Sequence, residues 1–341
     1  MHLKQPRHPV LIGAAVIIPW AMAWSLFGRP ADASQTRPPQ ANPARHQALE
    51  QFNLEGLTVA REEILPGGPG KDGIPALTNP RSVAVKHASF LPATDRIVSV
   101  SMGGAVRGYP LRILTWHEAI NDELGGTPIA VIYCPLCDSV SVVERRIGDK
   151  MVEFGISGLL HNSNVLLYDR GDNALWSQVG LRAISGPNAG KSLRHLPWRI
   201  STFGAFRQAH PDATVVSLDT GHRRDYGRNP YEAYFRGDRL MFPVSRQDAR
   251  LAPRTRVVGV RLGERAVAYP LARIGDSPDG ILIDEIDGER LVLRADAAGG
   301  IAVVEAPADA QVVHTFWFAW AAFHPQTQVF GEGAAAPPQA R

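Results

Sequence analysis

The feature that most constrains the fold of this 341-residue chain is a strand–turn pattern that occurs at two distant places in its sequence. Residues 97–104 (IVSVSMGG) lead into Gly-Tyr-Pro-Leu at 108–111, and residues 257–264 (VVGVRLGE) lead into Ala-Tyr-Pro-Leu at 268–271. Apolar β-type residues followed by a glycine turn are typical of a β-hairpin. The same local unit is therefore predicted twice.

The match continues downstream in the same order. Residues 203–216 (FGAFRQAHPDATVV) are similar to residues 320–330 (WAAFHPQTQVF), since each segment joins aromatic residues to a His-Pro turn and a short apolar run. Two matches in one order predict an internal duplication, with copies over about 97–217 and 257–330. The alternative is a chance similarity between two Tyr-Pro turns and two His-Pro turns.

Most of the remaining chain consists of short β-type runs separated by glycine, proline and aspartate. Hydrophobic residues make up 45% and charged residues 20% of the chain, as in folded globular proteins. Helical spacing is clearest at residues 200–210. The sequence thus predicts an α+β fold, predominantly β, with short strands and hairpins, a few helices and an internal duplication. Strands are expected at 96–102, 128–133, 139–145, 151–156, 164–168 and 256–261.

The N-terminus has the features of an export signal. Lys4 and Arg7 precede an uncharged run at 10–27, and Ala-Asp-Ala at 31–33 supplies the small residues of a cleavage site. The run of 18 residues is also long enough for an uncleaved membrane anchor. In either case we expect a periplasmic or extracellular protein. It would contact the membrane only if the anchor is retained, and then only through that anchor.

These signals divide the chain into five parts. We predict a signal peptide or membrane anchor, a Pro-rich flexible linker, a first repeat that contains both cysteines, a shorter degenerate second repeat, and a disordered tail. Their ranges are 1–33, 34–48, 49–250, 251–331 and 332–341.

Charge and motifs argue against several function classes. The formal net charge is +3, of which Lys4, Arg7 and Arg29 against Asp32 account for +2. No stripe of Lys and Arg with interleaved aromatic residues follows, so no nucleic-acid partner is expected. Neither a phosphate-binding glycine loop nor a G-x-S-x-G elbow is present, so the sequence supports neither a nucleotide cofactor nor serine hydrolysis.

The chain has only two cysteines, Cys134 and Cys137, separated by a proline and a leucine. The residues that follow alternate as strands do around a Gly-Asp turn at 148–149, which predicts a β-hairpin over 139–156 in place of a helix. The pair has three interpretations: thiolate ligands of a metal ion, a thiol–disulfide oxidoreductase, or a structural disulfide. Without a helix N-terminus to stabilise a thiolate, the oxidoreductase is less favoured.

Metal binding is the leading hypothesis for the two cysteines. Two sulfurs in one tight turn converge on a point, and thiolate combined with imidazole favours copper or zinc. The predicted ligands are Cys134, Cys137, His117, which precedes the cysteines, and His161, which the hairpin would return beside them. The metal ion is the partner that this hypothesis implies. Whether the chain is an enzyme, and which proteins it contacts, is left open.

Three polar, turn-rich segments support a further hypothesis. Taken together, they supply arginine, aspartate, tyrosine and tryptophan side chains in turns, at residues 168–172, 176–178 and 223–231. These side chains either pin loops by charge-assisted hydrogen bonds or line a pocket over the cysteines. The third possible function is therefore a ligand-binding or scaffold module with a structural disulfide.

Seven motifs taken together resemble the bacterial domain-of-unknown-function 3179 family, over about residues 60–330. The resemblance implies an exported, strand-rich fold without an established activity. Asp138 and His161 depart from the family pattern, which has glycine and tyrosine at these positions, so the resemblance favours His117 over His161 as a ligand. The motifs are GYPL at 108–111, WHEAINDE at 116–123, IYCPLC at 132–137, FGISGLL at 154–160, YDR at 168–170, LWSQ at 175–178 and DYGRNPY at 225–231.

Overall fold

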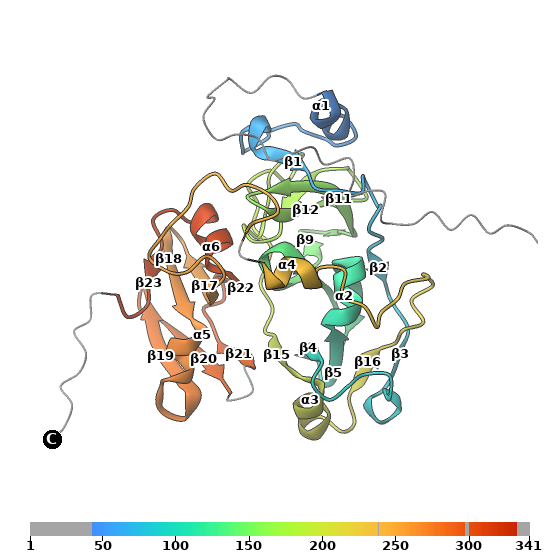
Figure 1. Cartoon of the computed structure of the whole chain (residues 1–341), viewed down its shortest axis with the longest axis vertical. Helices are drawn as coiled ribbons and strands as arrows, with labels where there is room; N and C mark the ends of the chain where they lie inside the picture. Colours follow the sequence, from blue (N-terminus) through green and yellow to red (C-terminus); the bar gives the residue numbers. More distant parts are fainter. Residues whose placement is uncertain (1–42, 238, 297–299, 333–341) are drawn as a thin grey trace, which may run out of the picture. The chain divides into compact units, whose positions relative to one another are not determined.

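The computed structural model of this protein describes residues 43–237, 239–296 and 300–332 (Figure 1). Within these residues the strands form two eight-stranded sheets, a five-stranded sheet and a two-stranded hairpin, while the helices are short. The predicted α+β fold, predominantly β, is confirmed. The signal peptide or anchor predicted over 1–33 lies outside the described residues, as does nearly all of the predicted tail. No described helix is both long and apolar enough to span a bilayer.

The first large sheet has the strand order β19-β20-β21-β15-β4-β5-β16-β3. Its neighbouring strands are antiparallel, except that β5 and β16 are parallel. The strands are β3 (Ser82–Ala84), β4 (Arg96–Met102), β5 (Ala105–Pro110), β15 (Arg199–Thr202), β16 (Thr214–Val216), β19 (Ile281–Ile286), β20 (Glu289–Ala295) and β21 (Ile301–Glu305).

The second large sheet has the order β2-β6-β7-β8-β22-β17-β18-β23 and contains the strand that ends at the first cysteine. Its two outermost pairs, β2 with β6 and β18 with β23, are parallel, and the other pairs are antiparallel. The strands are β2 (Leu77–Thr78), β6 (Ala119–Leu124), β7 (Thr127–Cys134), β8 (Ser139–Glu144), β17 (Arg256–Leu262), β18 (Arg265–Pro270), β22 (Gln311–Phe316) and β23 (Gln328–Val329).

The third sheet is antiparallel, with the order β1-β11-β12-β13-β14. Figure 1 shows β1 beside β11 and β12. The strands are β1 (Ile64–Pro66), β11 (Phe154–His161), β12 (Asn164–Asp169), β13 (Leu175–Ser177) and β14 (Arg182–Ala183).

The β-hairpin predicted over 139–156 is wrong in its pairing. A strand does follow the cysteines, but β8 pairs with β7 on one side and with β22 on the other. Both edges of β8 are therefore occupied, and β11 joins the third sheet instead. Only the short strands β9 (Arg146–Ile147) and β10 (Lys150–Met151) form a hairpin across the Gly-Asp turn.

Helices connect the strands and lie at sheet ends. Helical structure is confirmed within the predicted stretch 200–210, where α3 follows β15 and the Thr202 hydroxyl accepts a hydrogen bond of 3.2 Å from the Ala205 amide. Residues 43–48, the end of the predicted linker, fall within α1. The helices are α1 (Pro43–Leu49), α2 (Leu111–His117), α3 (Phe203–Ala209), α4 (Glu232–Arg236), α5 (Leu271–Gly275) and α6 (Trp317–Phe323), with 3-10 turns η2 (Arg61–Glu63), η3 (Val85–His87), η4 (Pro135–Cys137) and η5 (Pro278–Gly280).

The order of strand pairings in the first predicted repeat recurs in the second. Strand β4 pairs with β5 and β15, and β16 lies parallel to β5; in the same way β17 pairs with β18 and β22, and β23 lies parallel to β18. Equivalent side chains also meet. The Tyr109 hydroxyl donates a hydrogen bond of 2.8 Å to Asp122, and the Tyr269 hydroxyl donates one of 2.6 Å to Asp284. Internal duplication itself stays a prediction.

Strand β7 is buried on both faces, as its uninterrupted apolar run indicates. Tyr133 belongs to a hydrophobic cluster that includes Val98 of the first large sheet. Cys134 belongs to a different cluster, which includes Phe154 of the third sheet. Because successive side chains of a strand point to opposite faces, the cysteine faces the third sheet and the preceding tyrosine faces the first.

Candidate thiol site

The two cysteines lie in a turn between two central strands. Strand β7 ends at Cys134, η4 covers the next three residues, and β8 begins at Ser139, which pairs with Cys134. We call residues 134–137 the thiol turn. Pro135 suits the first position of the 3-10 turn because its φ is already restricted. No α-helix follows the cysteines, as the alternating residues predicted.

Both thiols are reduced and buried, with exposed fractions of 1% for Cys134 and 0% for Cys137. The Cys137 sulfur lies 3.1 Å from the carbonyl oxygen of Ser163, and the Asn164 amide lies 3.7 Å from the same sulfur as a donor. The β11–β12 turn therefore packs against the thiol turn.

The two thiols differ in acidity. Burial raises the pKa of Cys134, but the hydrogen bond from Cys137 and backbone amides at Val165, Cys137 and Leu136 outweigh it, so the pKa falls below its ordinary value. Burial, the hydrogen bond to Cys134 and the charge of Cys134 hold the pKa of Cys137 well above its ordinary value. Cys134 is therefore the thiol that ionises first.

Glu118 is the buried acidic group whose charge interacts with both thiols. It follows α2 directly, in the left-handed conformation with φ of 56°, and its carbonyl oxygen accepts a hydrogen bond of 2.8 Å from the Tyr133 amide. Its side chain is buried. Burial first, and the charge of Cys134 second, hold the pKa of the Glu118 carboxyl well above its ordinary value. The site thus combines two thiols with a carboxyl that tends to keep its proton.

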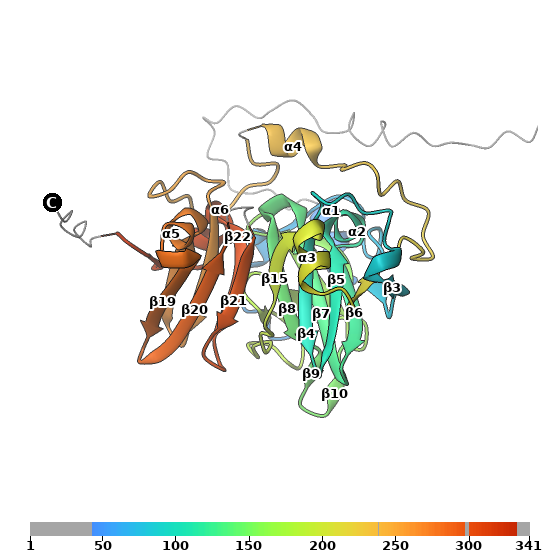
Figure 2. The same ribbon diagram turned by 90° about the horizontal axis from the view of Figure 1, so that it is seen from below.

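Residues 226–236, which we call the cover segment, lie over this group. The Tyr231 hydroxyl is 3.4 Å from a carboxyl oxygen of Glu118, to which it donates. In α4, the Tyr234 hydroxyl donates a hydrogen bond of 2.8 Å to the carbonyl oxygen of Leu136. Figure 2 shows α4 beyond the ends of the strands of both large sheets. Tyr231, the last residue of the polar segment 223–231, therefore contacts Glu118, and the helix that follows contacts the thiol turn.

His117, the preferred histidine ligand, is engaged elsewhere. Its Nδ1 lies 2.7 Å from the carbonyl oxygen of Pro75, and its Nε2 lies 2.6 Å from the Tyr226 hydroxyl. Burial is the main cause that lowers the pKa of His117 to about 4, so the ring is neutral at neutral pH. The residue that interacts electrostatically with the thiols is the next one in the chain, Glu118.

His161 lies near the thiol turn in the chain trace, but its ring is directed to other residues. Its Nε2 is 3.3 Å from a carboxylate oxygen of Glu63, and its ring packs edge-on against Phe323 with centroids 5.1 Å apart. Among the described residues no group of three or more His, Cys, Asp or Glu side chains is arranged to hold a metal ion. The predicted ligand set of two cysteines and histidine is thus not assembled.

Sequence reasoning therefore missed three residues of the site, Glu118, Asn164 and Tyr234, whereas Tyr231 belongs to the polar segment 223–231 that was expected either to pin loops or to line a pocket over the cysteines. Of these three, only Glu118 had a usable signal, because it stands in the same Trp-His-Glu motif from which His117 was chosen. The search for soft-metal ligands favoured the histidine. Tyr234 comes from α4, almost a hundred residues downstream, and no local pattern connects it to the cysteines.

Asp138 directly follows the thiol turn, and its side chain lies on the face of β7 opposite to the cysteines. Its φ of 46° lies in the left-handed region, which explains why the resemblance predicts glycine at this position. Its carboxylate bonds to Arg96 and Arg256, each at 2.7 Å, and accepts a hydrogen bond of 3.1 Å from the Tyr133 hydroxyl. Although burial raises the pKa of Asp138, the nearby positive charges lower it far below its usual range.

Comparison with known proteins identifies the family. The model of the family described as "Protein of unknown function (DUF3179)" matches residues 71–313, which is more than half of the chain. This match confirms the resemblance that the seven motifs predicted. Neither the curated proteins nor the solved structures include one that matches the chain.

Proposed function

We propose that this chain, which belongs to the DUF3179 family, carries a redox-active dithiol formed by Cys134 and Cys137, with Glu118 as the group that holds and returns the proton. The observation that carries the proposal is the buried carboxyl of Glu118, whose charge interacts with that of Cys134. A buried acid without a cationic partner costs stability. Strongly shifted pKa values of this kind are concentrated at functional sites.

The reaction that we propose is exchange with a low-molecular-weight disulfide. Cys134, whose own proton has gone to the solvent, attacks one sulfur of the reagent as a thiolate, which releases one thiolate and leaves a mixed disulfide. The Glu118 proton goes to the released thiolate. Cys137 then passes its own proton to Glu118 and attacks Cys134, which releases the second thiolate. The second thiolate takes a proton from the solvent, so the products are one Cys134–Cys137 disulfide and two small thiols.

Burial favours a small reactant over a protein. Sulfurs that are 1% and 0% exposed cannot meet a protein disulfide unless the cover segment moves away. The unequal acidity of the thiols supports the order of attack, since the thiolate is the nucleophile and Cys134 has the lower pKa.

The experiment is a redox titration of the full chain in mixtures of reduced and oxidised glutathione. Free thiols are trapped with an alkylating reagent and counted by mass spectrometry. We expect both thiols to disappear together, reversibly, with a single midpoint. Glu118→Gln should slow disulfide formation near neutral pH, whereas Glu123→Gln, a matched change at an exposed position of β6, should not. Thiols that remain free throughout, or equal rates for the two variants, would contradict the proposal.

The second candidate function is binding of a copper or zinc ion by the two thiols alone. The observation in its favour is that both sulfurs belong to one turn and that donors approach both of them. Thiolates are soft ligands that suit these ions. Elemental analysis of the purified chain separates the candidates: one equivalent of metal that is lost in a Cys134→Ser/Cys137→Ser variant supports the ion, and metal-free protein that cycles with glutathione supports the dithiol.

A further inference from the structure

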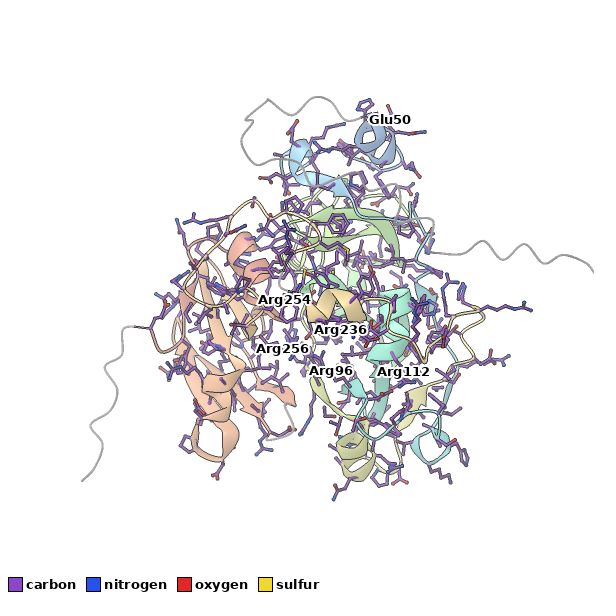
Figure 3. All side chains as sticks on the ribbon, in the orientation of Figure 1. Glu50, Arg96, Arg112, Arg236, Arg254 and Arg256 are labelled. Carbon is purple, nitrogen blue, oxygen red and sulfur yellow. The ribbon has the colours of Figure 1, made fainter. Side chains whose placement is uncertain are left out.

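A cavity of about 320 Å³ lies on the other side of β7, beside Tyr133. Four arginines line it: Arg96, Arg112, Arg228 and Arg256. Figure 3 shows Arg256, Arg96 and Arg112 in a row next to α4. The volume falls in the range of about 300–1,000 Å³ that is usual for small-molecule sites.

Two of these arginines share one buried carboxylate. Arg96 donates through Nη1 to one oxygen of Asp138, and Arg256 donates through Nε to the other. The Asp138 side chain is 0% exposed, while the two arginine side chains are 35% and 47% exposed. The carboxylate therefore fixes both arginines at the cavity wall. Within the described residues, neither Nη atom of Arg256 donates a hydrogen bond, so both are available to a ligand.

The other two arginines differ in their partners. Arg112 is paired with Asp95, which also lines the cavity, and a hydrogen bond of 2.8 Å from its Nη2 is part of that pair. The Arg228 side chain makes no ion pair or hydrogen bond with any described residue. Among the described residues, the four arginines are paired with two carboxylates, those of Asp138 and Asp95. Two positive charges around this small cavity are therefore not compensated.

We propose that this cavity is a binding site for a small organic or inorganic anion that carries a carboxylate or phosphate group, with Arg256 and Arg228 as its main contacts. The planar guanidinium group presents paired N–H donors that match the two oxygens of such a group. Tyr133 separates the cavity from the thiol turn, and the proposal does not depend on the thiol chemistry. Arg96 and Arg256 are the first residues of β4 and β17, the strands with equivalent pairings in the two repeats.

The site can be tested by isothermal titration calorimetry of the full chain. The probes are inorganic phosphate and malonate, which distinguish a phosphate from a carboxylate ligand, and choline chloride serves as a cation of similar size. We expect at least one of the two anions to bind with one site per chain, and choline not to bind. Arg228→Gln should weaken that binding about ten-fold, the usual effect of losing one charged hydrogen bond.

Two further variants complete the test. Arg256→Gln should weaken anion binding at least as much. Because that change also deprives the buried Asp138 of a partner, Arg228→Gln is the variant whose result does not depend on the stability of the fold. Arg236→Gln is the matched control, because Arg236 is an exposed arginine of α4 whose ion pair is with Glu232. If neither anion binds, or if Arg228→Gln binds as the wild type does, the proposal is overturned. Equal losses in Arg228→Gln and Arg236→Gln would overturn it too.

Discussion

The hydroxyl of Tyr234 donates a hydrogen bond of 2.8 Å to the carbonyl oxygen of Leu136, inside the turn that joins the two cysteines. The same tyrosine is held from its other side by Arg254, whose guanidinium carbon lies 4.3 Å from the ring centroid and whose Nη1 donates to the Tyr234 carbonyl oxygen at 2.8 Å. The cover segment is thus tied both to the thiol turn and to the chain that precedes β17. We therefore expect access to the sulfurs to depend on these contacts.

Loss of the Tyr234 hydroxyl should make the thiols more accessible. A neutral hydrogen bond contributes about 1 kcal/mol, so Tyr234→Phe should raise the rate of iodoacetamide labelling about five-fold under native conditions. The measurement is the mass of the intact chain against time. Tyr168→Phe is the control, because that hydroxyl bonds to Asp72 in another part of the chain. Labelling of Tyr234→Phe at the wild-type rate would show that the contact does not restrain the cover segment.

The unequal acidity of the thiols predicts the order of their modification. Because the pKa of Cys134 is lowered and that of Cys137 is raised well above its ordinary value, Cys134 holds the larger thiolate fraction near neutral pH. With limiting iodoacetamide, tandem mass spectrometry should find Cys134 modified before Cys137, because the thiolate is the form that reacts. In concentrated urea the preference should vanish. Modification of Cys137 first in the native chain would contradict the assigned roles.

Glu118 should make the folded state less stable as the pH rises. The folded chain keeps this proton after the unfolded chain has lost it near the ordinary pKa of 4.5, so the folded state binds more protons above that pH. Below pH 4.5 the Glu118 carboxyl is protonated in both states and does not reduce the free energy of unfolding. Above pH 4.5 that free energy falls, by up to about 1.4 kcal/mol per pH unit.

Glu118→Gln removes this dependence without changing the shape of the side chain. Urea unfolding should therefore show that the variant gains stability relative to the wild type as the pH is raised from 4.5 towards neutrality. The buried histidines titrate in both chains, so their effect cancels in the difference. Glu123→Gln should follow the wild type at every pH. A difference between Glu118→Gln and wild type that does not change with pH would mean that Glu118 ionises normally.

Asp138 should be a large contributor to stability. Asp138→Asn leaves Arg96 and Arg256 without their shared counter-charge, and we expect a loss of about 2–4 kcal/mol in urea unfolding, less than for a fully buried pair because the arginines are partly hydrated. The lowered pKa means that this contribution is present above pH 3.8 and is lost as the pH falls below it. Asp219→Asn breaks an exposed pair with Arg81 and should cost less than about 1 kcal/mol. Similar losses in the two variants would contradict this assignment.

Local pattern was sufficient to predict much of the strand content and the character of the thiol turn. The predicted strands at 96–102 and 164–168 correspond to β4 and β12, and the run at 128–133 lies within β7. These predictions hold because apolar runs bounded by glycine and proline report on the backbone over a few residues. The absence of an α-helix after the cysteines was predicted for the same reason.

The partners of those elements were decided only by tertiary structure. Strand β8 is filled on both edges by β7 and β22, the latter more than 160 residues later in the chain, so the predicted hairpin could not form. The choice between His117 and Glu118 depends on one left-handed residue at the end of α2 and on its bond to Tyr133 in β7. The sequence alone was enough to identify Cys134 and Cys137 as the residues whose sulfur atoms could react or bind a metal ion. Which carboxyl and which tyrosines surround these sulfur atoms depends on long-range packing, which has no signature in local spacing.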